Sequence, residues 1–207
     1  NIMYALVESG TITKYFNYAR GFTLGDLQYP ADIFMKWSVE EKEAIGIHEV
    51  VFDDSNKKNE QWYINTNQTF AFADGVVTAS YGTAVPKAHA DSLWTSQDAT
   101  DGLIPSNKSV GDVRVQGLKT TLIRDLKVNV SNELSKTDWY ITRNTEKSVA
   151  IPSAISTHRD AVRTAQASIE AQIIGAADTA ALETLYTHTI TDGVQSRPLG
   201  KLPGLES

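Results

Sequence analysis

The segment from Leu134 to Arg163 constrains the fold more than any other part of the chain, because it predicts a bent connection between two helices. A helix is expected to end near Ser135. A compact turn is expected at 137–140, where the sequence is Thr-Asp-Trp-Tyr. A second helix is then expected from Pro152, since proline fits the first helical turn, where its missing N–H has no partner to lose. The first helix is predicted from apolar side chains at three- and four-residue steps, the spacing of one helix face: Val115, Leu118, Leu122, Leu126, Val130 and Leu134.

The second helix has the same one-sided pattern. Its apolar face is formed by Ile155, Val162, Ile169 and Ile173, and it is expected to end at Gly175. Asp178 can cap a last short helix through its carboxylate. Residues 112–190 therefore predict a helical hairpin with a short third helix. Two helices cannot fully cover two apolar stripes, so self-association or docking to another chain is expected.

Five side chains near the bend are expected to set the angle of the hairpin rather than to carry out chemistry. The carboxylate of Asp138 can cap or close the turn. Trp139 is expected to fill the gap where the two helices diverge, and Arg143 and Glu146 carry charges that can pair across the loop. Pro152 completes this set as the start of the second helix.

Residues 1–82 predict a small antiparallel β-rich domain. Segments 3–8 and 11–16 alternate with period two around Ser9-Gly10, and segments 69–73 and 76–81 flank Asp74-Gly75. Both pairs favour hairpins, because glycine at the second position adopts the positive φ that a primed turn needs. Two further strands are expected at 47–53 and 60–66, joined by a polar hairpin tip at 54–59.

One short helix is expected to interrupt these strands. Ser38 and Glu41 form a capping box, in which each side chain accepts from the other residue's backbone N–H. Gly46 provides a left-handed residue after the last turn. Pro30 favours a preceding turn of helix that runs toward Trp37. The whole chain is therefore expected to be α+β.

Residues 83–111 predict a linker between the two domains. Proline, glycine, serine and aspartate occur there without period, which indicates loop. Trp94, Leu103 and Ile104 are isolated apolar residues within it. If such a long segment is ordered, either its own domains or a neighbouring chain must hold it. We favour a neighbouring chain and take these three residues as interface candidates.

Residues 191–207 predict an extended C-terminal tail. Pro198 and Pro203 prevent helix, while Leu199, Leu202 and Leu205 recur at three-residue steps. Tails of this kind lie in grooves as extended or polyproline-like strands. Pro198 and the three leucines are therefore further interface candidates.

Composition and motifs favour a non-enzymatic role. The chain has no cysteine, which excludes disulfides and thiolate chemistry, and its net charge of −6 does not favour nucleic-acid binding. No apolar run reaches the length that spans a bilayer. Phosphate-binding, dinucleotide-binding, zinc-protease and serine-hydrolase motifs are absent from the sequence. The four histidines are scattered, so we expect neither a metal nor a cofactor, and we expect His158 to be a partly exposed polar residue.

Aromatic residues crowd the predicted β domain and leave two interpretations open. They could form a surface on which carbohydrate rings stack, or they could be core residues with a large apolar area to bury. The core interpretation is favoured. The aromatic residues are Tyr4, Tyr15, Phe16, Tyr18, Trp62, Tyr63, Phe70, Phe72 and Tyr81.

Three segments together resemble the tail-fibre and tail-fibre-assembly proteins of tailed phages. Residues 3–15, MYALVESGTITKY, are similar to the N-terminal hairpin of that family. Residues 22–50 are similar to its aromatic segment and Glu-rich helix. Residues 134–163 are similar to its C-terminal module, with Thr-Asp-Trp, then Arg and Glu, then Ile-Pro and spaced arginines. This last motif is the most specific of the three.

The resemblance implies assembly rather than catalysis, and it supplies no catalytic residues. It implies a virion tail protein, made in the host cytoplasm, that associates with other phage tail proteins and with copies of itself. A tail-fibre assembly chaperone that is released from the mature particle is the alternative. A glycan-binding or depolymerising tail protein is the third possibility, motivated by the aromatic residues.

Overall fold

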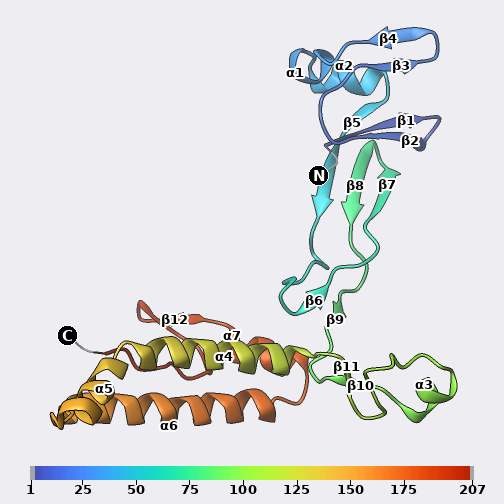
Figure 1. The fold of residues 1–207 in the computed structure, drawn as a ribbon. Helices are drawn as coiled ribbons and strands as arrows, with labels where there is room; N and C mark the ends of the chain where they lie inside the picture. The colour runs from blue at the N-terminus through green and yellow to red at the C-terminus, as the bar shows by residue number, and fades with distance from the viewer. Residues whose placement is uncertain (1–2, 206–207) are drawn as a thin grey trace. The chain divides into compact units, whose positions relative to one another are not determined.

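The computed structural model describes residues 3–205, and it divides into two compact units at Val85 and Pro86 (Figure 1). The first unit is mainly β and the second is mainly helical, so the predicted α+β class is confirmed. The division falls close to the predicted end of the β domain. Most of segment 83–111 belongs to the second unit.

The first unit is built around a five-stranded sheet in the order β2-β1-β5-β8-β7. Both predicted hairpins are present. Ser9 and Gly10 join the first pair with φ of 51° and 77°, and Asp74 and Gly75 join the second pair with φ of 51° and 77°. These positive angles belong to type I′ turns. The elements of this unit are β1 (Tyr4–Glu8), β2 (Thr11–Phe16), β3 (Phe22–Leu24), β4 (Leu27–Tyr29), α1 (Ile33–Lys36), α2 (Val39–Ala44), β5 (Ile47–Asp53), β6 (Tyr63–Ile64), β7 (Thr69–Ala73) and β8 (Val76–Ser80). Strand β9 (Val85–Pro86) contains the point of division.

The predicted hairpin between 47–53 and 60–66 is wrong. The first half of β5 pairs antiparallel with β1, and its second half pairs parallel with β8. Only Tyr63–Ile64 is a strand in the second segment, and it pairs with β9. Asn65 instead ties this segment into a loop, because its side chain bonds the N–H and the C=O of Lys58 at 2.9 Å each. Long-range pairing with β1 and β8 therefore replaces the local hairpin.

Strand β1 is buried on both faces and separates two cores. Leu6 faces a cluster with Phe16, Phe22, Ile33, Phe34 and Ile47, whereas Ala5 faces a cluster with Val50, Val77 and Ala79. Several aromatic rings are thus core residues, and Trp62 and Tyr63 are buried as well. Tyr15 and Tyr18 are exposed exceptions.

The predicted helix after Ser38 is confirmed as α2. The hydroxyl of Ser38 accepts from the N–H of Glu41 at 3.2 Å, and the Glu41 carboxylate accepts from the N–H of Ser38 at 2.8 Å. Gly46 follows with φ of 90°, and a Cβ there would lie 2.3 Å from the carbonyl oxygen of Val7. Only glycine therefore fits both the turn and the close approach of β1. The turn of helix predicted after Pro30 begins at Ile33 as α1.

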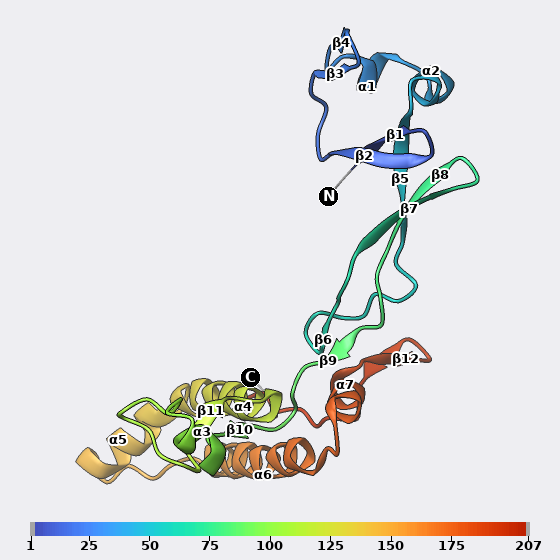
Figure 2. The same ribbon diagram turned by 90° about the vertical axis from the view of Figure 1, so that its right-hand side faces the viewer.

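The second unit is a helical hairpin in which α4 and α6 lie side by side (Figures 1 and 2). The apolar face predicted for α6 is buried at Ile155, Val162, Ile169 and Ile173. Asp178 caps α7 by accepting from the N–H of Ala181 at 2.8 Å. The elements are β10 (Ser92–Leu93), α3 (Ser96–Thr100), β11 (Val113–Val115), α4 (Leu118–Ser135), α5 (Asp138–Lys147), α6 (Ser153–Gly175), α7 (Thr179–Tyr186), β12 (Thr189–Thr191) and β13 (Val194–Ser196).

The segment predicted as a linker is structured and is held by its own chain. It contains β10 and α3, and Val115, predicted as helical, lies in β11, which pairs with β10. The carbonyls of Ala88 and His89 accept from the N–H groups of Leu118 and Lys119, which open α4 and would otherwise lack a partner. A neighbouring chain is therefore not needed to hold this segment in place.

The predicted extended tail begins with a hairpin. Strands β12 and β13 pair across Asp192 and Gly193, whose φ values are 52° and 77°. This Asp-Gly signal is the same as that at 74–75, and the reading of 191–207 as a tail overlooks it. Residues 197–205 belong to neither a helix nor a strand.

Candidate functional site at the helical hairpin junction

The connection between α4 and α6 is longer and more ordered than a compact turn. The prediction of a turn at 137–140 is wrong, because Asp138 begins the ten-residue helix α5. The predicted end of the first helix at Ser135 is confirmed. The second helix begins at Ser153, with Pro152 immediately before it. Three helices thus meet where two were expected.

A buried arginine holds this junction together. The Nη1 of Arg159, on α6, donates to the carbonyl oxygen of Leu134 at 2.8 Å, to the hydroxyl of Thr137 at 2.7 Å and to the carboxylate of Asp138 at 2.9 Å. Arg159 is 7% exposed and Thr137 is fully buried. The Leu134 carbonyl lies in the last turn of α4, where a carbonyl lacks an intrahelical donor and a cation is favoured. Asp138 therefore closes the junction through Arg159 rather than as a cap.

A second polar contact lies next to the first. The Nε2 of His158 is 3.1 Å from the carboxylate of Glu133, which also pairs with the ammonium of Lys136. The hydrogen bond from Lys136 is the main cause that holds the pKa of Glu133 below its ordinary value. His158 is buried, so the prediction of a partly exposed side chain is wrong. Its partner, Glu133, lies 25 residues earlier in the chain.

Beyond this buried cluster, three side chains of α5 form a surface that we call the aromatic platform: Trp139, Tyr140 and Arg143. The two rings are 3.7 Å apart between centroids. The guanidinium of Arg143 lies 4.7 Å from the Trp139 centroid and 5.4 Å from that of Tyr140. Trp139 is 51% exposed, so the prediction that it fills a gap between the helices is wrong. It is presented outward instead.

The predicted pairing of Arg143 with Glu146 does not occur among the ion pairs of residues 3–205. In a helix these residues are three positions apart, but Arg143 turns toward the two aromatic rings. Its Nε is buried without a hydrogen-bond partner, and Glu146 is exposed. Cation–π attraction replaces the predicted ion pair.

The interface candidates of segment 83–111 take up positions within their own unit. The indole of Trp94 is half-buried under the guanidinium of Arg114, 4.8 Å from the ring centroid. Leu103 is exposed and Ile104 is half-buried. Leu103 is therefore the most accessible of the three.

The tail candidates follow helices α6 and α7. Leu199 is buried, and its N–H donates to the carbonyl of Leu185 at 3.0 Å. The Gln172 side chain donates to the Pro198 carbonyl at 3.0 Å and accepts from the Gly200 N–H at 3.1 Å. The predicted groove for the tail thus lies on the same chain, at least as far as Gly200. Leu202 is half-buried and Leu205 is exposed.

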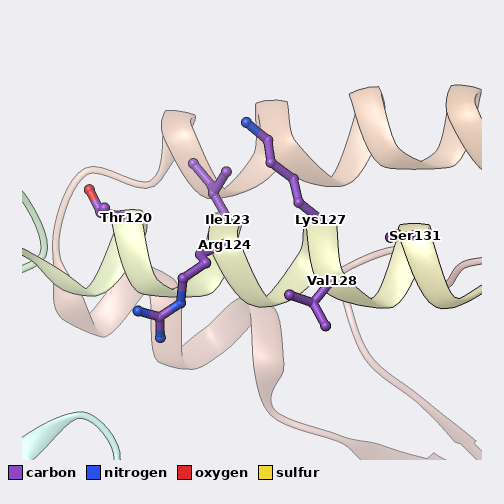
Figure 3. A pocket seen from close by; sticks show the side chains of 6 residues that line it. All are labelled: Thr120, Ile123, Arg124, Lys127, Val128 and Ser131. Atoms are coloured by element: carbon purple, nitrogen blue, oxygen red, sulfur yellow. The ribbon is translucent and has the colours of Figure 1, made fainter.

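An open hollow of about 540 Å³ lies along α4 (Figure 3). Its lining combines two cations, two hydroxyls and two aliphatic side chains, and contains no carboxylate or imidazole: Thr120, Ile123, Arg124, Lys127, Val128 and Ser131. Lys127 is 3.7 Å from Glu170. This set offers no acid–base pair.

Two other kinds of site are not found among residues 3–205. No cluster of three or more histidine, aspartate or glutamate side chains is placed to hold a metal ion. None of the helices in that range has the length and apolar character needed to cross a bilayer. In comparisons with known proteins, no family model, curated protein or solved structure matches this chain.

Proposed function

We propose that this chain is a structural protein of a bacteriophage tail, associated with the fibre or the baseplate. It joins neighbouring tail proteins and further copies of itself. It binds neither nucleic acid nor a membrane, and it catalyses no reaction. Its sequence resemblance to tail-fibre and tail-fibre-assembly proteins in residues 3–15, 22–50 and 134–163 supports this assignment.

The observation that carries the proposal is the division of the Thr-Asp-Trp motif into an inner and an outer part. Thr137 and Asp138 bind Arg159 and fix α5 against α6. Trp139, the next residue, is exposed beside Arg143. Aromatic and arginine side chains of this kind dominate the binding energy of protein interfaces. A fixed helix that presents them suits a protein whose role is to hold another chain.

The first test asks whether the chain is a stoichiometric part of the particle. Virions produced from the encoding genome are purified and quantified by mass spectrometry against a known tail protein. We expect a constant ratio between the two chains across preparations. Absence from purified virions would contradict the virion role.

A variant pair tests the aromatic platform. Trp139→Ala removes the largest exposed ring of α5, whereas Ile174→Ala removes an exposed aliphatic side chain at the far end of α6. We expect Trp139→Ala to be incorporated less well than the wild type although it remains folded and loses little stability, with Ile174→Ala close to the wild type. Equal incorporation of the wild type and both variants would show that the aromatic platform does not bind another tail protein.

The assembly chaperone remains the second candidate, because an exposed platform also suits temporary binding. This role predicts a soluble complex with a fibre chain in infected cells and loss from mature particles. Size-exclusion chromatography of the lysate, followed by mass spectrometry of both fractions, separates the two roles. Glycan binding is tested with a glycan array and a hydrolysis assay, both of which we expect to be blank.

A further inference from the structure

The edge strand β7 carries none of the features that usually prevent strands of different molecules from pairing. Its sequence, Thr-Phe-Ala-Phe-Ala, has no charge and no proline, although charged residues make up 21% of the chain. It lies at one end of the five-stranded sheet and pairs with β8. Natural proteins usually protect such an edge with lysine, proline or a bulge, because its unpaired backbone groups can template another strand.

Strand β2 does not pair with this edge in the described chain. It lies at the opposite end of the sheet order and pairs with β1. It approaches β7 on the core face of the sheet, where Ile12 and Phe70 pack against the same cluster and the rings of Tyr15 and Phe70 are 4.8 Å apart. Phe70 belongs to the core face of the sheet. Among residues 3–205, no strand therefore pairs with the outer edge of β7.

The turn at Asp74-Gly75 determines which backbone groups point to this edge. In a two-residue hairpin the closing pair, here Ala73 and Val76, is hydrogen-bonded, and bonded pairs then alternate along the ladder. Ala71 pairs with Thr78 in the same bonded way. Phe70 and Phe72 consequently direct their N–H and C=O groups away from β8, on either side of Ala71.

We propose that the β7 strand of a second copy of this chain pairs antiparallel with this edge, about a twofold axis that passes between the two Ala71 residues. In this register Phe70 of each copy faces Phe72 of the other, so all the outward backbone groups of these residues are bonded. The strand is its own complement, which is the requirement of an isologous interface. The inference rests on β7 and β8 alone and is independent of the proposed function.

The side chains on the other face of the sheet allow this approach. Thr69, Ala71 and Ala73 are exposed, small and uncharged, and they share this face. Across the twofold axis Ala71 faces Ala71, while Thr69 of each copy faces Ala73 of the other. Two copies of β7 then join two sheets into one continuous sheet.

Cysteine cross-linking tests this register directly, because the wild-type chain has no cysteine. Ala71→Cys places two thiols in a non-hydrogen-bonded antiparallel pair, whose Cα separation of about 4.5 Å suits a disulfide. Ala73→Cys is the matched control, since it alters the same residue type on the same face but places the two thiols far apart. We expect rapid covalent dimerisation of the full chain with Ala71→Cys and slow dimerisation with Ala73→Cys. The double variant Thr69→Cys/Ala73→Cys should cross-link again.

A charge test uses the same two positions without oxidation. Ala71→Lys places two ammonium groups opposite each other, whereas Ala73→Lys faces the neutral Thr69 of the partner. Analytical ultracentrifugation should show a wild-type dimer whose dissociation constant rises about tenfold or more in Ala71→Lys and changes little in Ala73→Lys. Circular dichroism verifies that each variant is folded.

Three results would overturn the proposal. The first is a wild-type chain that stays monomeric across the range of protein concentrations, which would show that β7 does not pair with a second copy. The second is equal cross-linking of Ala71→Cys and Ala73→Cys, which indicates random collision. The third is a wild-type dimer that Ala71→Lys does not weaken, which indicates another interface.

Discussion

The two ends of helix α4 are held by charges of opposite sign. At its start, the carboxylate of Asp91 accepts from the N–H of Gly117 at 2.6 Å and from the hydroxyl of Thr120 at 2.7 Å. At its end, Arg159 donates to the carbonyl of Leu134. An anion at the start and a cation at the end both oppose the partial charges of the helix termini.

The two anchors differ in burial and in what they connect. Arg159 is buried and joins three neighbouring acceptors at the bend between α4 and α5. Asp91 is more accessible and ties the helix to a segment that lies 26 residues before Gly117. The end anchor therefore fixes an angle between helices, whereas the start anchor fixes the path of a long connection. The predictions below separate these two roles.

The largest effect is expected from Arg159→Met. This variant keeps most of the side-chain volume but removes the guanidinium donor that the Leu134 carbonyl, the Thr137 hydroxyl and the Asp138 carboxylate share. The Leu134 carbonyl then accepts only from the N–H and the hydroxyl of Thr137. We expect the free energy of unfolding to fall by roughly 3 kcal/mol. Urea denaturation followed by circular dichroism measures it.

Arg163→Met is the matched control, one helical turn further along α6. Arg163 is exposed and contacts the exposed Asp160 at 3.4 Å, so its loss should change stability by less than about 0.5 kcal/mol. A similar loss in both variants would mean that the buried cluster around Arg159 does not hold the junction.

A smaller effect is expected at the start anchor. Asp91→Ala removes both the acceptor and the charge, whereas Asp91→Asn keeps an oxygen that can accept from Gly117 and Thr120. We expect the order of stability to be wild type, then Asp91→Asn, then Asp91→Ala, with every loss smaller than that of Arg159→Met. Asp125→Asn, on the exposed middle of α4, serves as the charge control. Equal losses in Asp91→Asn and Asp91→Ala would assign the whole effect to charge.

Acid should remove the contribution of Asp91. The hydrogen bond from the Thr120 hydroxyl, followed by that from the Gly117 N–H, holds the pKa of Asp91 below its ordinary value. The stabilisation is therefore complete above the unfolded-state pKa of about 3.9 and is lost as the pH falls through the lower folded-state pKa. Denaturation curves from pH 7 downward should show the wild type and Asp91→Asn converging only in that acidic window. A difference that persists at the lowest pH would contradict this assignment.

Apart from the control variants, the smallest effect on stability is expected from Trp139→Ala. A buried tryptophan in the bend would cost about 3–5 kcal/mol to remove, but the observed ring is half exposed. We expect a loss of less than about 1 kcal/mol, which reflects the contacts with Tyr140 and Arg143. A loss comparable to that of Arg159→Met would place Trp139 in the structural core of the junction.

Local signals predicted much of the fold correctly. The turns at Ser9-Gly10 and Asp74-Gly75, the capping box of Ser38 and Glu41, and the apolar face of α6 are all present. Each of these features is formed by residues that are close together in the chain. The local sequence pattern is therefore enough to predict it. The hairpin at Asp192-Gly193 has the same Asp-Gly turn sequence and could have been predicted, although the prediction of an extended tail over 191–207 does not include it.

The incorrect predictions share a different cause. Segment 60–66 fails as a partner of β5 because β5 pairs with β1 and β8, which are far away in sequence. The helix α5 was missed because its apolar residues, Trp139–Ile141, are consecutive and do not recur at three- and four-residue steps. It is held by Arg159 from α6. Burial of His158 depends on Glu133, which no spacing rule connects to it.

The sequence alone determined the α+β class, the two local hairpins and the two long helices, because these depend on period, turn chemistry and capping within a few residues. The tertiary structure alone decided that Arg159 is the centre of the junction, that Trp139 faces outward and that no strand among residues 3–205 pairs with the outer edge of β7. These properties depend on which distant segments come together and on what remains uncovered when they do. The bend between Leu134 and Arg163 was visible in the sequence, but the buried guanidinium that bonds both α4 and α5 there was not.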